Sequence, residues 1–247
     1  MRIAVLSDIH GNVVALKRAL EAVDALQPDS LFCLGDVVGY GPEPEACVEL
    51  IRARADVCLA GNHDLAVVGA LPLSAFNPVA REAILWHRTH LSRESLDWLA
   101  SLPTRQDLPD LTLAHGSPRA PVWEYVTDPE TAAENYDAFE PPVCLIGHSH
   151  LAMAWRLHKE RGQIEARLTG EEPGVPLALD IGDKWLLNPG GVGQPRDHDP
   201  RASFALLDLE ARTWTWHRVA YDVDAVARAI LDAGLPEVLG TRLYLGW

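Results

Sequence analysis

Residues 1–12 read MRIAVLSDIHGN, and this stretch sets the pattern from which the fold can be worked out. The apolar run Ile3–Ser7 is typical of a buried strand, and Asp8 and His10 follow it at once. Asn12 can then cap a helix. The apolar residues beyond it fall at helical spacing: Val13, Leu16, Leu20 and Val23. The stretch therefore predicts a strand, a polar turn and a helix in succession.

The same alternation continues along the chain. Apolar runs at Leu31–Leu34 and Val57–Ala60 are typical of buried strands, and the segment from Pro44 to Ile51 has a helical apolar face. This β-α-β-α-β order predicts a parallel sheet at the start of an α/β fold. Later strands are expected over 111–114, 143–146, 152–157, 164–168, 185–187, 204–207 and 213–219, followed by a helix over 222–233.

Residues 65–102 interrupt this pattern with two helices. Asn77-Pro78 is typical of a helix start with proline in the first turn, and a second helix is expected from Ser92 to Leu102. We expect this segment to be a helical insertion in a single domain spanning residues 1–247. Two mixed sheets flanked by helices account for the remaining pattern.

Composition excludes several classes of protein. The chain has 247 residues with 35 Asp+Glu against 21 Lys+Arg, a net charge of −14, which argues against a basic face for long nucleic acid. Its apolar runs are far shorter than a membrane span, and the first one is too short for a signal peptide. We therefore expect a cytoplasmic protein with reduced cysteines and no membrane partner. The pattern is compatible with a homo-oligomer.

Polar residues follow five of the predicted strands. They are Asp8 and His10, Asp36, the run Asn62-His63-Asp64, His115, and the pair His148 and His150. Strand ends in an open α/β sheet meet at one edge, where ligand sites are usually built. The sequence therefore predicts a single site assembled from segments that lie far apart in the chain.

The residue types at this edge suit metal ions. Asp8-x-His10 and His148-x-His150 place side chains at i and i+2, on the same side of an extended backbone. Two Asp, one Asn and four His are too many ligands for one tetrahedral ion but suit two ions that share a carboxylate, either Asp36 or Asp8. Imidazole and carboxylate ligands without thiolate favour Mn, Fe, Zn, Co or Ni over Mg or Ca, and we expect Mn.

The ordered set of motifs resembles the calcineurin-like metallophosphoesterase superfamily. The match runs from Asp8-x-His10 through Gly35-Asp36, Gly61-Asn62-His63-Asp64 and His115 to Gly147-His148-Ser149-His150. The segment from Asn188 to Arg196 is similar to one in its small prokaryotic phosphodiesterase branch. The resemblance implies a four-layer α/β/β/α sandwich.

The resemblance also implies a role for each residue. Asp36 would bridge two ions, and His63 would be the catalytic histidine, with Asp64 orienting it. A hydroxide bridging the ions would attack phosphorus in line, while His63 binds the phosphoryl group or protonates the leaving alkoxide. The remaining ligands would be Asp8, His10 and His150 on the first ion, and Asn62, His115 and His148 on the second.

The substrate expected from the sequence is a small or nucleotide-like phosphodiester. Protein phosphatases of the superfamily carry an arginine just after the bridging aspartate, whereas the chain here reads Asp36-Val37-Val38-Gly39-Tyr40. Tyr40 could stack on a base or only pack, and Arg196 could pair with the phosphate or lie solvated in a loop. With Asn62 they are the candidate substrate-binding residues.

Other functions and sites compete with this interpretation. A dinucleoside polyphosphate hydrolase and a phosphomonoesterase are the alternative activities, and a non-catalytic scaffold of the same fold is disfavoured because His63 and all seven expected ligands are present. His87 and His90, three residues apart on a predicted helix without a matching carboxylate, are expected on its surface.

Overall fold

The first sheet grows from the β-α-β-α-β pattern at the N-terminus. The computed structural model describes residues 1–247. In spatial order the strands are β3 (Val57–Cys58), β2 (Ser30–Cys33), β1 (Arg2–Leu6), β11 (Ala202–Asp208), β12 (Thr213–Val219) and β9 (Leu177–Ala178). Strands β1, β2 and β3 are parallel, whereas β11, β12 and β9 add antiparallel neighbours, so the sheet is mixed.

The second sheet is also mixed. Its strands are, in spatial order, β4 (Arg105–Asp107), β5 (Leu111–Ala114), β6 (Val143–Leu145), β10 (Lys184–Pro189), β7 (Ala152–Glu160) and β8 (Gln163–Thr169). Strands β5, β6 and β10 run parallel, and β7 and β8 form an antiparallel hairpin. The short strands β4 and β9 were not predicted, because two or three residues carry too little periodicity.

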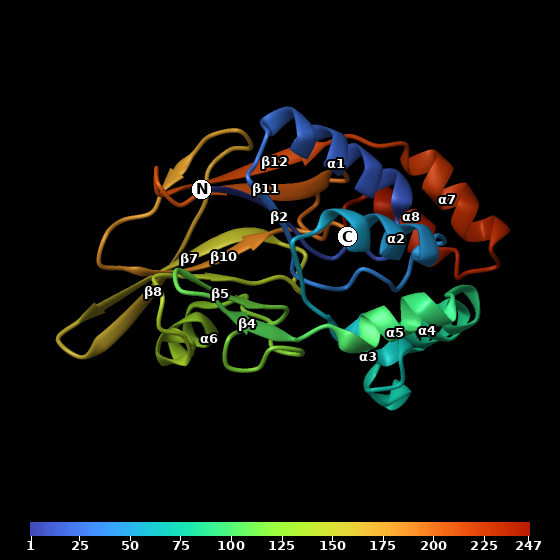
Figure 1. Ribbon diagram of the computed structural model, residues 1–247, viewed down its shortest axis with the longest axis horizontal. Coiled ribbons are helices and arrows are strands. Elements are labelled where there is room, and N and C mark those ends of the chain that lie inside the picture. The colour runs from blue at the N-terminus through green and yellow to red at the C-terminus, as the bar shows by residue number, and fades with distance from the viewer.

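The two sheets pack face to face, and helices cover their outer faces (Figure 1). Alternate residues such as Ile3, Val5, Leu113 and Leu145 fill the core between the sheets. The outer face of the first sheet packs against α1 (Val13–Leu26), α2 (Pro44–Arg54), α7 (Val223–Asp232) and α8 (Val238–Thr241). The short helix α6 (Pro129–Glu134) covers part of the second sheet. This arrangement confirms the predicted four-layer α/β/β/α sandwich.

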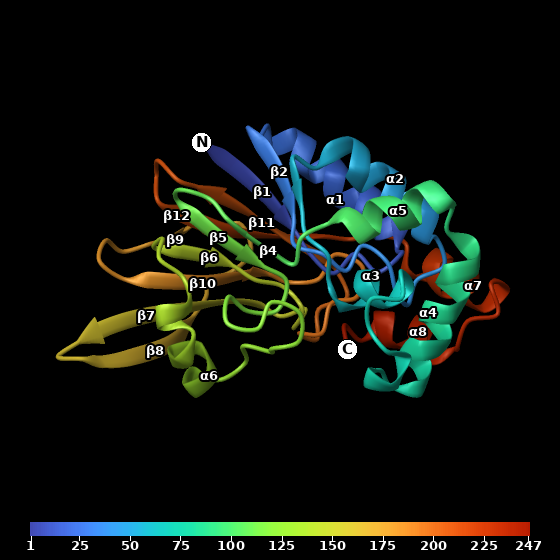
Figure 2. The same cartoon turned by 60° about the horizontal axis from the view of Figure 1, so that its bottom comes forward.

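The two helices expected between residues 65 and 102 are present. Helix α4 (Pro78–His90) begins at Asn77, whose side chain accepts a hydrogen bond from the Ala80 amide, and α5 (Arg93–Ser101) begins at Ser92. With α3 (Asn62–Val67), they lie at the end of the molecule opposite the β7–β8 hairpin (Figure 2). None of the helices has the length and apolar character needed to cross a membrane.

Candidate metal centre

The polar residues singled out in the sequence come together where β1, β2, β5 and β6 end. Parallel strands present their carboxyl ends to the same edge, so these segments meet although they are up to 142 positions apart. Nine of the side chains are at most 4% exposed: Asp8, His10, Asp36, Asn62, His63, Asp64, His115, His148 and His150. Buried carboxylates and imidazoles at this density require partners, since an isolated buried charge is costly.

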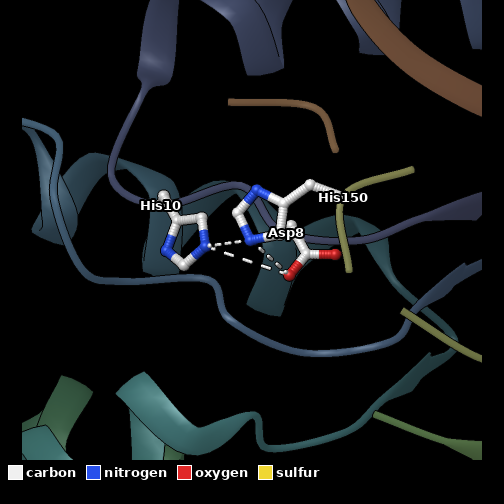
Figure 3. Close-up of side chains that lie close together, drawn as sticks. All are labelled: Asp8, His10 and His150. Carbon is white, nitrogen blue, oxygen red and sulfur yellow. Dashed lines mark hydrogen bonds and ion pairs between the residues drawn. The ribbon is translucent and has the colours of Figure 1, made fainter. Parts of the chain in front are cut away.

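Asp8, His10 and His150 form the first group (Figure 3). Asp8 Oδ1 lies 3.2 Å from His150 Nε2 and 3.9 Å from His10 Nε2. The two Nε2 atoms are themselves 3.1 Å apart. One carboxylate oxygen and two ring nitrogens therefore converge on a single point.

The hydrogen bonds of these rings favour a cation at that point. His10 Nδ1 lies 3.0 Å from the Val38 carbonyl oxygen, and His150 Nδ1 contacts the Gln194 carbonyl oxygen. A carbonyl only accepts, so each Nδ1 carries the proton and each Nε2 presents a lone pair. Two lone pairs facing each other at 3.1 Å repel unless a cation lies between them. The donor set thus fits a metal ion, since ligating histidines usually donate their other N–H in this way.

Asp36, His115 and His148 form a second group. His115 Nδ1 lies 2.9 Å from the Leu34 carbonyl oxygen, and its Nε2 faces Asp36 Oδ2, 3.4 Å away, and Asn62 Oδ1, 3.3 Å away. Burial lowers the His115 pKa, but the Asp36 carboxylate outweighs it and raises the pKa to about 9. His148 Nε2 is buried and has no hydrogen-bond partner. The second group therefore also brings ring nitrogens and side-chain oxygens to one place, with His148 Nε2 unpaired among them.

Asp36 joins the two groups. Its Oδ2 atom lies 3.4 Å from His115 Nε2 and 3.7 Å from His10 Nε2, while its Oδ1 accepts a 2.8 Å hydrogen bond from the His63 amide. Burial opposes ionisation, but the neighbouring His115 and His63 hold the pKa of this carboxyl below its usual range. Asp36 is thus held as a carboxylate between both sets of histidines.

The backbone at the site differs from the prediction. Five residues of the site have a positive φ, between 50° and 63°: Asp8, His10, Asp36, His148 and His150. The prediction that Asp8-x-His10 and His148-x-His150 lie on extended backbone is therefore wrong. Left-handed backbone costs a non-glycine residue about 1–2 kcal/mol, and such strain clusters at functional sites. The turns also separate His148 from His150, which join different groups.

His63 lies beside both groups at the start of α3. The run Asn62-His63-Asp64 forms the first turn of that helix. The His63 ring packs against the rings of His10 and Tyr40, whose centroids are 4.9 and 4.5 Å away. His63, His10 and Asp36 also form a third group of side chains close enough together to hold a metal ion. Unlike His10, His115 and His150, it has no carbonyl partner, and its Nδ1 is buried and unpaired. Burial lowers the His63 pKa to about 4.

Asp64, expected from the sequence to orient His63, makes its side-chain hydrogen bonds to backbone amides and none to the His63 ring. Its carboxylate accepts hydrogen bonds from the amides of Gly61 (2.9 Å), Val38 (3.1 Å) and Val37 (3.3 Å). It therefore ties the start of α3 to the loop after β2. Burial, followed by the nearby Asp36 charge, raises the Asp64 pKa to about 7.

His87 supports the loop Gly39-Tyr40-Gly41 through two hydrogen bonds. Its side chain is fully buried, whereas the sequence predicted it on the surface of the helix. His87 Nδ1 accepts a 3.0 Å hydrogen bond from the Gly39 amide, and its Nε2 donates over 2.7 Å to the Gly41 carbonyl. Gly39 has a φ of +99°, and a Cβ there would collide with the His63 ring. The periodicity of α4 could not reveal this, because the partners of His87 lie 46 and 48 positions away. His90 is exposed as expected.

Replacing His87 by phenylalanine is expected to destabilise the protein by about 2–4 kcal/mol, because it leaves a buried amide and a buried carbonyl without partners. Urea unfolding followed by circular dichroism measures the change. The control is His90→Phe on the exposed surface of the same helix, expected to change stability by less than about 0.5 kcal/mol. Equal effects of the two substitutions would mean that the Gly39–Gly41 loop does not depend on His87.

Tyr40 and Arg196 lie beside the metal centre. Tyr40 is 7% exposed and packs its ring against His10, and the Arg196 guanidinium carbon lies 6.0 Å from the Tyr40 ring centroid. Arg196 Nη2 donates to Gln194 Oε1 over 3.0 Å, whereas its Nε is buried without a partner. After burial, the Arg196 charge is the largest influence lowering the pKa of His150. Arg196 therefore places a positive charge beside the site, although no arginine directly follows Asp36 in the sequence.

Two aromatic residues at the site were missed. The Tyr125 ring stacks on His148 at 4.0 Å and 24°, and Trp123 packs against Phe76 at 5.2 Å. The only signal in the sequence is an aromatic pair spaced i, i+2 in a loop, which by itself predicts no site.

Comparisons with known proteins agree with this geometry. The family model described as "Calcineurin-like phosphoesterase superfamily domain" matches residues 1–212. A metallophosphoesterase structure from Sphaerobacter thermophilus is 43% identical, with a TM-score of 0.88 and full coverage of both chains. An uncharacterized protein of Methanocaldococcus jannaschii is 36% identical over 99% of this chain and 98% of its own.

A weaker similarity connects the chain to a nucleotide hydrolase. A symmetrical bis(5'-nucleosyl)-tetraphosphatase of Chromohalobacter salexigens is 33% identical over 138 residues, which cover 52% of this chain and 49% of that protein. The similarity spans only half of each protein, whereas the family match extends over most of this chain. With its histidine and aspartate cluster at the strand ends and its four-layer fold, the chain belongs to the calcineurin-like phosphoesterase superfamily.

Proposed function

We propose that the protein is a dinuclear metal-dependent phosphodiesterase that hydrolyses small or nucleotide-like phosphodiesters. The observation that carries this proposal is the position of Asp36 Oδ2, 3.7 Å from His10 Nε2 and 3.4 Å from His115 Nε2. One oxygen so placed can serve two ions at once. Asp8, His10 and His150 would hold one ion, and Asn62, His115 and His148 the other, with Asp36 between them.

Two bound divalent ions would supply an activated water and neutralise charge on the phosphoryl oxygens. The absence of thiolate and the mixture of imidazole, carboxylate and amide oxygen favour Mn, Fe, Zn, Co or Ni, and Mn remains our choice. The side chains supply the rest. Arg196 can donate paired hydrogen bonds to a phosphoryl oxygen. His63, whose Nδ1 has no partner in the protein, can bind the phosphoryl group or carry a proton to the leaving oxygen.

A diester is favoured by the charges around the centre. No arginine follows Asp36, and Arg196 is the candidate cation for the phosphate. A diester carries one negative charge at neutral pH, whereas a phosphomonoester carries nearly two and asks for more neutralisation. The similarity to a symmetrical bis(5'-nucleosyl)-tetraphosphatase supports a dinucleoside polyphosphate as a second candidate substrate, which would be cleaved by the same residues.

Hydrolysis of matched substrates by Mn-loaded protein tests the proposal. We expect a higher kcat/KM for bis(p-nitrophenyl) phosphate than for p-nitrophenyl phosphate, and for nucleotide diesters than for phosphoserine or phosphothreonine peptides, because one guanidinium suits a singly charged phosphate. Diadenosine tetraphosphate in the same panel examines the second candidate. A higher kcat/KM for phosphopeptides than for every diester would overturn the proposed substrate class.

A further inference from the structure

Trp123 and Tyr125 are exposed beside the metal centre on a rigid segment. Trp123 is 40% exposed and Tyr125 is 48% exposed. Between them, Glu124 accepts hydrogen bonds from Ser117 (2.6 Å) and from Asn135 (2.8 Å) and forms an ion pair with Arg119. Both aromatic rings are therefore presented by a fixed backbone, not by a loose loop.

The rings of Trp123 and Tyr125 contact different parts of the site. The Trp123 ring packs against Phe76 with centroids 5.2 Å apart, and Phe76 packs against His63 at 5.3 Å. The Tyr125 ring instead stacks on His148 at 4.0 Å. The rings of His63, Phe76 and Trp123 thus form a continuous row that ends at the exposed face of Trp123. Tyr125 contacts the second group of ligands through His148.

Core packing does not account for the position of Trp123. Phe76, at 8% exposed, closes the contact with His63 and buries the apolar surface there. A tryptophan two-fifths exposed, two residues from a half-exposed tyrosine, leaves flat apolar surface in water beside the metal centre, where a planar ligand can cover it. With a net charge of −14, the protein also gains little long-range attraction for an anionic ligand, so local contacts must hold it.

We infer that Trp123 is the platform on which a planar nucleobase of the substrate stacks, with the scissile phosphodiester reaching the metal centre between His63 and Arg196. The inference rests on the proposed function and names the part of the substrate that the site selects. Every base has a π-face, so stacking accepts different bases and strengthens binding roughly 5- to 150-fold per base. The substrate class is therefore a nucleoside-bearing phosphodiester, selected for having a base and not for which base it has.

Two diesters with the same leaving group test the inference. Thymidine 5'-(p-nitrophenyl phosphate) carries a base, whereas methyl p-nitrophenyl phosphate carries none. We expect Trp123→Ala to lower the ratio of kcat/KM for the thymidine ester to kcat/KM for the methyl ester roughly 5- to 150-fold. Trp123→Phe should retain most of the preference, and Tyr136→Ala, which removes a ring next to Lys159 and Lys184 on the second sheet, should leave the ratio unchanged.

A binding measurement separates the platform from the chemistry. Calorimetry on Mn-loaded protein is expected to show tighter binding of AMP than of ribose 5-phosphate, with the difference lost in Trp123→Ala and kept in Trp123→Phe. If the wild-type protein hydrolysed neither ester, the proposed function would be rejected. The calorimetry would still show whether a nucleobase stacks on Trp123. Equal losses for both esters in Trp123→Ala, or equal binding of AMP and ribose 5-phosphate by the wild type, would overturn the inference.

Discussion

Replacing Asp36 by asparagine is expected to abolish both metal binding and hydrolysis. The substitution keeps the size of the side chain and an oxygen for the His63 amide, but it leaves no charge between His10 and His115. Wild-type protein loaded with Mn should hold close to two ions per chain, and the variant fewer than one. Without two bound ions, the charge on the phosphoryl oxygens is no longer neutralised, so kcat should fall by at least about 10³-fold. Elemental analysis after gel filtration and hydrolysis of bis(p-nitrophenyl) phosphate measure the two effects.

Asp183 provides a matched control for Asp36. It is also a buried aspartate next to a histidine, at 5% exposed, but its partners are Arg156 and His158 on β7 of the second sheet, whereas Asp36 follows β2 of the first sheet. Asp183→Asn should keep both ions and normal kcat, even if it lowers stability. Retention of two ions by Asp36→Asn would show that Asp36 does not bridge the two groups.

Replacing His63 by alanine is expected to separate chemistry from metal binding. His10, His115 and His150 each donate Nδ1–H to a backbone carbonyl, as metal ligands do, whereas neither His63 nor the expected ligand His148 has such a partner. His63 differs from His148 in lying at the start of α3, with its ring packed against Tyr40 and Phe76. The variant should therefore keep both ions and lower kcat by about 10²–10⁴-fold on alkyl esters. The loss should be smaller for p-nitrophenyl esters, since that leaving group needs little protonation.

Three outcomes decide the role of His63. His90→Ala, at an exposed histidine, should change neither metal content nor rate. Because His63 lies in one group with His10 and Asp36, loss of metal as complete as in Asp36→Asn would make His63 a ligand. Unchanged metal content together with an unchanged rate on alkyl esters would mean that His63 is not the proton donor.

Local sequence was sufficient for the main elements of this fold. The strand expected over Ile3–Ser7 forms over Arg2–Leu6, and the one expected at Leu111–Ala114 has those bounds. Their apolar runs bury side chains wherever the strand is placed, so each strand can be predicted from neighbours in sequence alone. The strand ends also identify the site, because every parallel strand delivers its next residue to the same edge.

The backbone shape at the site could not be predicted in this way. Asp8 and His10 adopt left-handed conformations while their amides donate to the carbonyls of Gly35 and Asp36 on the neighbouring loop. A non-glycine residue is rare in that conformation, so local preference predicts the opposite. Hydrogen bonds between loops from adjacent strands offset this strain at Asp8 and His10. His148 and His150 are also left-handed, and they belong to different groups.

The sequence by itself determined which residue types reach the strand ends, and with them the four-layer fold, the family and the metal-binding chemistry. Tertiary structure alone decided how those residues combine: Asp8 with His150, Asp36 between His10 and His115, and Trp123 against Phe76. The physical reason is range. Helical and strand periodicity act over a few residues, whereas Asp8 and His150 are 142 positions apart and meet only through the pairing of strands and the packing of two sheets.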